Sequence, residues 1–446
     1  MRGNGDSWRK YRWHWKCAEK TVLTEKLIHY FRQIPDYRCG REKRHDLGEM
    51  LVCVTLGFLC GRTTIRRSLK WCKTHLEELR KHMKLKYGIA SPSTITRMLC
   101  GIDEELALYA FMEWIGEIVE SRNTHLAIDG KALCGATEKT KGETTPMLLN
   151  VVETVRGLIL AQLPVDSKTN EITAIPELLK LLDISGSIVT IDAVGTQTAI
   201  MEQIHEQGGH FVLTVKKNQP EAYEEIHTFM DKLGAEDLKR KKGEAMDPGM
   251  KEFLEKYEEI SQMEKNRDRN EYRTCQICKD ASNLTKSQKE WPHVQSIGRI
   301  KQVRIPKEKD SQGNDVTPSK EEFLEKGSRR IPAPSAGEGA GKDVQCTALI
   351  SDLILTAEEL GSIKRMHWSI ENRLHHVLDD TFREDRSPAK KSRNNLSLIR
   401  KYAYNILRLA MYETGLANIM TEMMDCFCDN AALRERYVFQ GIASLY

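Results

Sequence analysis

Hydrophobic residues recur every three or four positions over the first quarter of the chain, between residues 20 and 118. The segments TEKLIHYFRQI, LGEMLVCVTLGFLCG and LKWCKTHLEELRKHMK share this spacing, which is typical of amphipathic helices. The segment SPSTITRML adds a Ser-Pro start before another apolar turn, as expected at a helix N-terminus. The pattern predicts a basic tail over residues 1–20 and an all-helical N-terminal domain over residues 21–120.

After residue 120 the pattern changes to short runs of Val, Ile and Leu, bounded by Gly, Pro, Asp or Asn, which indicate buried strands. The strand candidates are HLAIDGKALCG, PMLLNVVETV, GLILAQLPV, SIVTIDAV and HFVLTVKK. Two helix-periodic segments, NEITAIPELLKLLD and TQTAIMEQIHEQG, separate the last three of them. This order predicts a meander of three strands followed by parallel crossovers, and hence an α/β layered domain.

Residues 221–343 interrupt this rhythm with Lys- and Glu-rich segments and with RRIPAPSAGEGAGK, whose composition is typical of a linker. Within the interruption, NEYRTCQICKD and VQSIGRIKQVRI are strand candidates. Beyond it, Thr356 and Glu359 form a capping-box pattern at the start of the helix candidate TAEELGSIKRMHWSIENRLHHVLDDTF. The amphipathic segment NLSLIRKYAYNILRLAMYE follows. We therefore expect an insertion within an α/β domain over residues 121–412, and a C-terminal tail over residues 413–446.

The composition is that of a globular protein, with 446 residues, 40% hydrophobic residues, 30% charged residues and a net charge of +4. So small a net charge identifies no partner, but the basic residues are grouped. Nine of them against two acids lie between Arg62 and Lys86, and seven with no acid lie between Arg386 and Tyr412. Such groups suit phosphate contacts, and an ordinary solvated basic face is the equal alternative.

The twelve cysteines form neither a four-cysteine zinc pattern nor a regular disulfide framework. The N-terminus lacks the apolar core of a secretory signal, and the longest apolar run is shorter than the roughly 20 residues that a membrane helix needs. These features predict a cytoplasmic protein with reduced thiols.

Two aspartates stand at the ends of apolar strand candidates, Asp129 in HLAIDGKALCG and Asp192 in SIVTIDAV. If the two strands are neighbours, the acids lie side by side, and a divalent cation would offset the cost of burying and crowding them. Glu371, on the late helix candidate, is the leading third ligand. Its rivals on the same segment are Asp379, Asp380 and Glu384. For either aspartate alone, a turn or a helix cap is the more common role, and Glu371 alone is equally compatible with a surface glutamate.

A zinc site is a competing interpretation of the same helix. His367, Glu371 and His375 are spaced at i, i+4 and i+8, and they are residue types that bind zinc. The order is not the H-E-x-x-H of a metalloprotease, and a zinc hydrolase would leave the two strand-end aspartates unexplained.

The chain resembles insertion-sequence transposases of the H-repeat-associated type, within the wider DDE transposase group. The resemblance lies in AIDGKALCG, LPVDSKTNEITAIPELLKLLDISGSIVTIDAVGTQ, FVLTVKKNQP and HWSIENRLHHVLDDTFREDRS, and nearer the N-terminus in IPDYRCGREKRHDLGEMLVCVTLGFLCG with SPSTITRML. It covers most of residues 27–412 and is weakest across residues 221–343.

The resemblance implies an α/β, ribonuclease-H-like catalytic domain, with the insertion placed before its last helix, and a catalytic, metal-binding triad of Asp129, Asp192 and Glu371. It implies two Mg²⁺ or Mn²⁺ ions as cofactors. The implied partners are DNA, both the terminal inverted repeats of an element and its target, and further copies of the chain, as a homodimer or larger assembly on DNA. The helical N-terminal domain is expected to contact DNA.

Related transposases carry a Tyr, Arg, Glu, Lys signature around the last acid, and this chain departs from it at His367 and Leu378. The positions that we expect to supply DNA contacts instead are Arg365, His367 and Arg373, with Lys216 and Asn218 after the last core strand. The leading hypothesis is a DNA transposase that cleaves element ends and joins the 3′-hydroxyl to target DNA by two-metal chemistry. The alternatives are a domesticated or inactive sequence-specific DNA-binding protein and a metal-dependent nuclease on the same fold.

Overall fold

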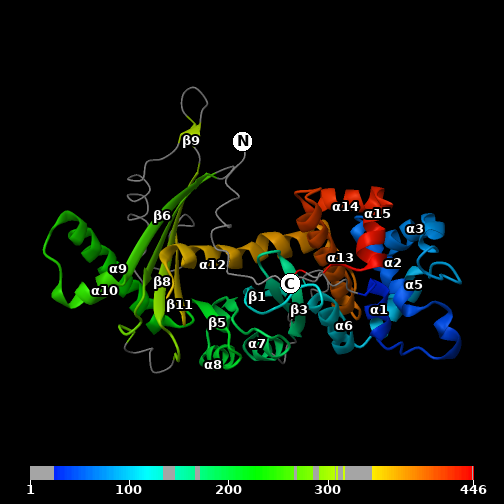
Figure 1. The fold of residues 1–446 in the computed structure, drawn as a ribbon, viewed down its shortest axis with the longest axis horizontal. Helices are drawn as coiled ribbons and strands as arrows, with labels where there is room; N and C mark the ends of the chain where they lie inside the picture. The colour runs from blue at the N-terminus through cyan, green and yellow to red at the C-terminus, as the bar shows by residue number, and fades with distance from the viewer. Residues whose placement is uncertain are drawn as a thin grey trace, which may run out of the picture. The chain divides into compact units, whose positions relative to one another are not determined.

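A computed structural model describes residues 25–133, 146–165, 171–265, 269–284, 291–306, 308–309, 315–316, 344–443 and 445. The predicted basic tail and the linker-like segment RRIPAPSAGEGAGK lie outside these residues. The chain divides into two compact units, Met1–Glu120 with Ala389–Tyr446, and Ser121–Pro388 (Figure 1). Within the described ranges, no helix is both long and apolar enough to cross a lipid bilayer.

The first unit is helical, as the spacing of its apolar residues predicts. Its elements are α1 (Leu27–Gln33), η2 (Gly40–Arg44), α2 (Leu47–Leu59), α3 (Ile65–Thr74), α4 (Leu76–Leu79), α5 (Pro92–Gly101), α6 (Glu104–Gly116), α13 (Arg393–Thr414), α14 (Met420–Asp429), α15 (Ala431–Arg434) and η9 (Glu435–Gln440). All 13 residues of α2 are buried, which explains why this helix is apolar on every side. It packs against α1, α3, α13 and α14.

Short polar side chains set where these helices begin. The caps Asp46, Thr64, Ser91 and Asp103 each accept a hydrogen bond from a backbone N–H in the first turn of α2, α3, α5 and α6. Each such cap stabilises its helix by about 1 kcal/mol. The Ser-Pro start predicted from SPSTITRML is confirmed, with Ser91 as the cap and Pro92 in the first turn.

Helix α13 belongs with the N-terminal helices. It packs against α2, α5 and α6, and the amide of Asn395 donates to the backbone oxygens of Leu99 and Ile102. The compact unit that contains the sheet ends at Pro388, and α13 lies in the other unit. The physical reason is that the apolar stripe of α13 covers a side of the fully buried α2.

The second unit is a mixed α/β structure around one nine-stranded sheet, with the strand order β3-β2-β1-β4-β5-β11-β8-β7-β6. Its strands are β1 (His125–Ala132), β2 (Met147–Glu153), β3 (Leu158–Val165), β4 (Ile188–Ile191), β5 (His210–Val215), β6 (Tyr257–Lys265), β7 (Arg269–Cys278), β8 (Ser296–Pro306) and β11 (Val344–Ser351). A separate pair is formed by β9 (Glu308–Lys309) and β10 (Asp315–Val316). The predicted meander of β1, β2 and β3 is confirmed, as are the parallel pairings of β4 with β1 and of β5 with β4.

The insertion extends the same sheet. Strand β11 pairs antiparallel with β5 on one side and with β8 on the other, and β7 and β6 continue outward from β8. Strands β7 and β8 confirm the two candidates found in the sequence, whereas β6 was not predicted. The helices of this unit are α7 (Glu171–Lys180), α8 (Thr198–Glu206), α9 (Pro220–Lys242), α10 (Lys251–Glu255) and α12 (Ala357–Ile370), with the short turns η4 (Ala193–Gly195), η5 (Pro248–Met250) and η8 (Glu384–Arg386).

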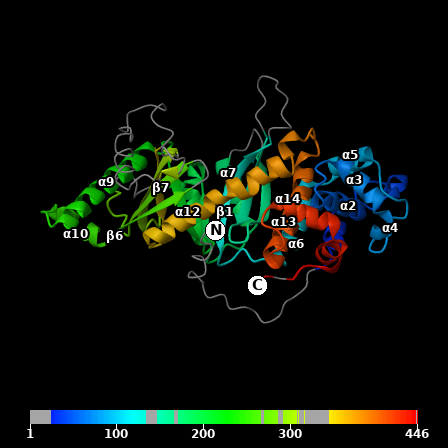
Figure 2. The ribbon, with the colours of Figure 1, turned by 90° about the horizontal axis from the view of Figure 1, so that it is seen from above.

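Helices α12 and α9 cover opposite faces of the sheet. A Cβ on Gly298 of β8 would lie 2.3 Å from Cδ2 of Leu360 on α12, whereas the guanidinium of the next residue, Arg299, donates to the backbone oxygen of His227 on α9. Neighbouring residues of a strand point to opposite faces, so the two helices must lie on different sides. Figure 2 shows α12 crossing the strands from the insertion toward β1. The helix predicted to start at the Thr356 capping box is confirmed.

The packing of α2 on α3 yields a stability prediction. A Cβ on Gly57 would lie 2.1 Å from Cβ of Ser68, and both residues are buried. We expect Gly57→Ala to reduce the free energy of unfolding by at least about 2 kcal/mol, because the helices must separate. Urea unfolding followed by far-UV circular dichroism measures the change.

The matched control is Gly116→Ala at the end of α6, where an added Cβ would meet no atom within 4 Å. A helical glycine replaced by alanine in open space is expected to gain about 0.5–1 kcal/mol. Equal effects of the two substitutions would contradict the close approach of α2 and α3.

Candidate active site

The first two predicted acids lie side by side because of strand register. Strands β1 and β4 are parallel and pair Ile128 with Ile191, so the next residues, Asp129 and Asp192, follow at the same level. Side chains two residues apart share a face of the sheet, and Thr190 contacts α12. Both aspartates therefore occupy the face that α12 covers.

Asp129 is held among other carboxylates. Burial raises the pKa of Asp129 to about 7, and the negative charges of Asp192, Glu371 and Glu171 add to this shift, although the backbone N–H of Gly130 donates to its carboxylate and opposes it. A cation placed among these acids would favour the ionised form and relieve the repulsion.

Helix α12 brings Glu371 to this position by successive contacts with three strands. Lys364 donates to the hydroxyl of Thr214 on β5 over 2.8 Å, and one turn later the imidazole of His367 lies 3.0 Å from the hydroxyl of Thr190 on β4. The next turn reaches Asp129 on β1. From Glu371 the helix continues as the wider π-helical turns η6 (Glu371–His375) and η7 (Val377–Thr381). Such turns are frequent at functional sites.

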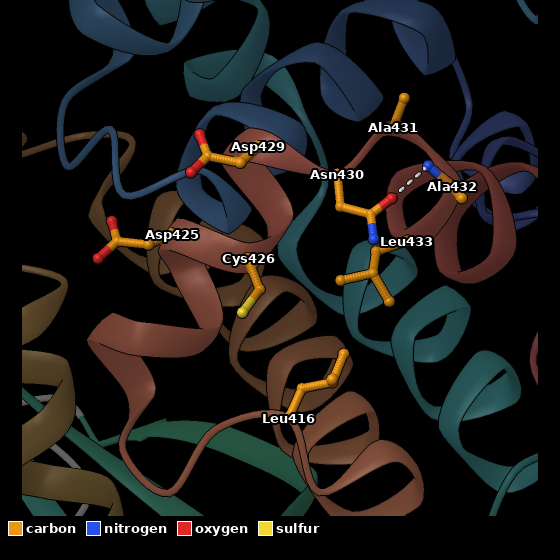
Figure 3. A pocket seen from close by; sticks show the side chains of 8 residues that line it. All are labelled: Leu416, Asp425, Cys426, Asp429, Asn430, Ala431, Ala432 and Leu433. Atoms are coloured by element: carbon orange, nitrogen blue, oxygen red, sulfur yellow. Dashed lines mark hydrogen bonds between the residues drawn. The ribbon is translucent and has the colours of Figure 1, made fainter.

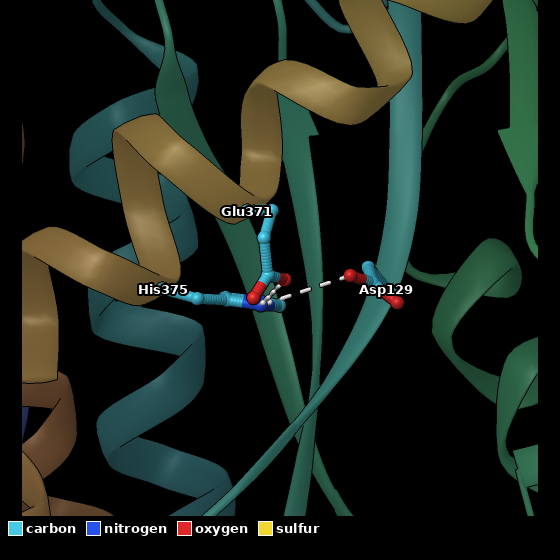
Figure 4. A group of neighbouring side chains, drawn as sticks. All are labelled: Asp129, Glu371 and His375. Carbon is cyan, nitrogen blue, oxygen red and sulfur yellow. Dashed lines mark hydrogen bonds and ion pairs between the residues drawn. The ribbon is translucent and has the colours of Figure 1, made fainter. Parts of the chain in front are cut away.

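Glu371, His375 and Asp129 form one group, shown in Figure 4. Nδ1 of His375 lies 3.2 Å from Oε2 of Glu371 and 3.7 Å from Oδ2 of Asp129. One ligand atom from each of the three residues lies within 4.8 Å of the other two. Two carboxylates and an imidazole are ordinary ligands of a divalent cation, so these residues fit such an ion.

Asp192 is engaged by a lysine. Nζ of Lys216 lies 2.7 Å from Oδ2 of Asp192, and more than two-fifths of each side chain is exposed. Burial alone would raise the pKa of Asp192, but the hydrogen bond and charge of Lys216 outweigh it and hold this pKa below its ordinary value. Beside this pair, the amide of Asn218 donates to the backbone oxygen of Ala193.

The other residues expected to contact DNA lie in different surroundings. Arg365 pairs with Glu264 on β6 at 2.8 Å, and Arg373 is exposed on η6. His367 is buried, and burial lowers its pKa well below the ordinary value, so its imidazole is neutral. Its hydrogen bond to Thr190 gives it a place inside the fold rather than on the surface. The zinc interpretation also loses support, because Glu371 groups with Asp129 and His375 and not with His367.

The rival acids have basic partners of their own. Asp380 pairs with the neighbouring His376 at 3.0 Å. Asp379 and Glu384 instead surround the buried ammonium of Lys131, together with Asp385. Lys131 is two residues beyond Asp129 and shares its face of β1. Local sequence assigns Lys131 no partner, because its acids follow 248 or more positions later.

Two further residues at the site were not singled out as its members. The sequence indicates His375 only as part of a zinc pattern, and it gives no indication of Glu171. Glu171 begins α7, and a Cβ on Gly130 would lie 3.2 Å from its Oε1. Burial and the charge of Asp192 raise the pKa of Glu171. An acid in the first turn of a helix is so common, because of the helix dipole, that its position alone carried no signal.

A hollow in the helical unit, shown in Figure 3, is a different kind of surface. Its lining includes the carboxylates of Asp425 and Asp429 and the side chain of Asn430, which accepts a hydrogen bond from the backbone N–H of Ala432. Asn430 thus serves as the cap of α15. No basic side chain is among the described residues that line the hollow, and its acids repel phosphate, so it does not suit a nucleic acid.

Comparison with known proteins relates most of the chain to one class of enzymes. The family model described as "Transposase DDE domain" matches residues 120–406, and the model described as "DDE_Tnp_1-associated" matches residues 28–115. The "H repeat-associated putative transposase YhhI" of Escherichia coli (strain K12) is 28% identical over 388 residues, covering 86% of this chain and 90% of the relative. "Putative protein YbfL" of the same strain shows the same identity and the same coverage.

A solved structure was also matched, described as "Cryo-EM structure of piggyBac transposase synaptic complex with hairpin DNA (SNHP)". It aligns with a TM-score of 0.39 and 10% identity, over 92% of this chain and 78% of that chain. A likeness of this size supports no conclusion about the fold.

The Lys131 cluster yields a prediction for the region beside the acids. The Lys131 side chain is 4% exposed, and Glu384 and Asp385 lie 3.4 and 3.6 Å from its Nζ. We expect Lys131→Met to reduce the free energy of unfolding by about 3–5 kcal/mol, because it removes the buried ammonium that three carboxylates surround. Urea denaturation measures this.

Lys180→Met is the control in the same unit, since Lys180 forms an exposed pair with Glu177. It should cost no more than about 1 kcal/mol. A loss of that small size for Lys131→Met would show that the cluster does not hold β1 to the segment after α12.

Proposed function

The chain belongs to the transposases with a DDE domain, and on that premise we propose that it cleaves the ends of a mobile DNA element and joins the freed 3′-hydroxyl to target DNA. One observation supports this best. Asp129, Asp192 and Glu371 come from segments far apart in the sequence, and they meet on the same face of one sheet. We propose them as the catalytic, metal-binding triad.

We infer that the catalytic unit is ribonuclease-H-like. The first support is the strand order β3-β2-β1-β4-β5, in which an antiparallel meander is followed by two parallel strands. The second is the late helix α12, which brings a third acid to the face of the sheet that carries the two aspartates. We propose the domain limits expected from the sequence, except for the C-terminal limit of the catalytic unit. The catalytic unit ends near Pro388, and the segment after it acts with the helical unit.

Divalent cations are part of the chemistry of this family, and we propose two Mg²⁺ or Mn²⁺ ions held by the triad. Such ions, when bound, activate the attacking oxygen and stabilise the leaving oxygen of a phosphodiester. The residues of the chain supply position and charge. Asp129 and Glu371 provide carboxylates on facing elements, and His367 and Lys364 hold α12 in its register on β4 and β5.

Lys216 has a second role in this proposal. Its ammonium neutralises Asp192 while no cation does so, and more than half of the side chain is exposed. When Asp192 takes up a cation, the ammonium is free to turn to a DNA phosphate. Arg373 and Arg365 are proposed as further phosphate contacts, since both are exposed on the same helix as Glu371. Asn218 and His367 are proposed to position the segments that carry these groups.

The helical unit is proposed to bind the element ends through α3. This helix buries Leu69, Trp71 and Cys72 and leaves its basic side chains exposed. The exposed cations are Arg66, Arg67, Lys70 and Lys73. Among the described residues no acid forms an ion pair with any of them, since the nearby Glu77 and Glu78 pair with Arg80 and Arg434. Cations without acidic partners suit phosphates. Because two ends must be joined, we propose a homodimer or larger assembly on DNA.

The triad is tested by conservative substitution. We expect Asp129→Asn, Asp192→Asn and Glu371→Gln each to reduce nicking of a labelled element end and its strand joining by more than about 100-fold, because removing one charged group from the catalytic centre costs roughly 3 kcal/mol of transition-state stabilisation. Binding of the same DNA should persist, as measured by fluorescence anisotropy.

The matched control is Glu358→Gln, which removes an exposed acid from the same helix. It should cleave like the wild type. Retained cleavage in Asp192→Asn would remove that residue from the triad. Binding without cleavage by the wild type would favour a DNA-binding protein, and unselective cutting would favour a nuclease.

The α3 face is tested by the salt dependence of DNA binding. Replacing Arg66, Arg67, Lys70 and Lys73 with Gln is expected to weaken binding at least about 10-fold at low salt. The slope of log K against log salt should fall by roughly 0.9 for each phosphate that the variant no longer neutralises. The control is Lys239→Gln with Lys241→Gln on α9, whose ammonium groups already pair with Glu236 and Asp237. An unchanged slope in the α3 variant would place the DNA elsewhere.

A further inference from the structure

We propose that His375 is a direct ligand of the divalent cation at Asp129 and Glu371, and that its nitrogen makes this position of the site prefer Mn²⁺ to Mg²⁺. The inference rests on the proposed function, because it adds a fourth residue to the triad that the family implies. It assigns the metal preference of one position, which the acids alone leave open.

Geometry is the first support. His375 is buried, and its Nδ1 faces two carboxylates at once, 3.2 Å from Glu371 and 3.7 Å from Asp129. Neighbouring ligands of one metal ion, each bonded over about 2.0–2.3 Å, lie roughly 3–4 Å apart. Both distances from Nδ1 therefore match the spacing of ligands around a shared ion, and one ligand atom of each residue lies within 4.8 Å of the other two.

The helix fixes the imidazole in this place. Residues four apart lie on the same side of a helix, so Glu371 and His375 leave η6 together and face β1. Leu374 and Leu378 are buried on either side of His375 and hold these turns against the fold. Ligands that are held in place before binding select a metal by type and geometry.

The chemistry of the donor atoms sets the preference for Mn²⁺ over Mg²⁺. Mg²⁺ favours oxygen ligands and keeps much of its water, whereas imidazole suits the transition metals. Replacing one oxygen donor by a nitrogen shifts the balance toward Mn²⁺. The simpler role for His375, a hydrogen bond that orients Glu371, would leave metal selectivity to the acids.

The two roles are separated by Mn²⁺ binding to the purified full-length protein without DNA. Free Mn²⁺ is counted by electron paramagnetic resonance during titration, and electron spin-echo modulation of the bound ion reports any directly coordinated ¹⁴N. We expect ¹⁴N modulation in the wild type, and a change to ¹⁵N modulation when the protein is grown with ¹⁵N-histidine. Absence of nitrogen modulation from Mn²⁺ bound to the wild type would overturn the inference without any variant.

Substitutions identify the residue that supplies the coordinating nitrogen. His375→Gln is expected to abolish the modulation and to weaken Mn²⁺ binding about 10-fold or more, while Mg²⁺ binding, measured by competition, changes less than about threefold. The control is His376→Gln, whose side chain is 68% exposed and pairs with Asp380. Modulation that survives in His375→Gln, or equal losses for the two metals, would overturn the proposal.

Asp129→Asn distinguishes failure of this inference from failure of the proposed function. If Asp129→Asn abolishes Mn²⁺ binding while His375→Gln leaves both affinity and nitrogen coupling intact, the acid site stands and the histidine ligand is rejected. If the wild type binds no Mn²⁺ at this site and cleaves no DNA, the proposed function fails together with the inference.

Discussion

The crossing of α12 over the sheet is the constraint on which the site depends. Lys364 and His367 bond to hydroxyls on β5 and β4, so the helix reaches β1 with Glu371 at the level of Asp129. Gly298 and Gly361 allow the helix to lie close to β8 and β7 earlier in its course. One helical turn of displacement, about 5.4 Å, would break both polar contacts and carry Glu371 past the aspartates.

Charge is distributed unevenly along β1, and this contrast defines what the site can do. Lys131 places one buried ammonium among three acids, so these acids share a cation that belongs to the chain itself. Two residues earlier, Asp129 experiences the negative charges of Asp192, Glu371 and Glu171, which raise its pKa. The nearby cations only partly compensate these charges, since Lys216 engages Asp192 and Lys364 bonds to Thr214. The acids around Lys131 thus have a lysine between them, whereas the acids around Asp129 form a site that attracts cations.

The sequence was sufficient for the parts that follow local rules. The strands around Asp129 and Asp192, the cap at Thr356 and the helical first unit all follow from period, caps and apolar runs. Contacts between distant segments could not be predicted from the sequence. The Lys131 cluster depends on how the chain continues after α12, and the place of α13 depends on the buried surface of α2. His375 carried no separate signal, because its partner Asp129 stands on another element. Strand β6 was not predicted, because its Lys and Glu residues are also common in loops.

The position of β11 in the middle of the sheet has a consequence for synthesis on the ribosome. Val215 of β5 pairs with Ala348 of β11. One edge of β5 therefore cannot form its hydrogen bonds until the whole insertion and β11 have been synthesised. At about 5–20 residues per second, the delay is roughly 7–27 s. During this delay Asp129 and Asp192 have already been synthesised, but Glu371 has not. The nascent chain therefore carries an unpaired strand edge during this delay, and Glu371 is added only after the insertion has been made.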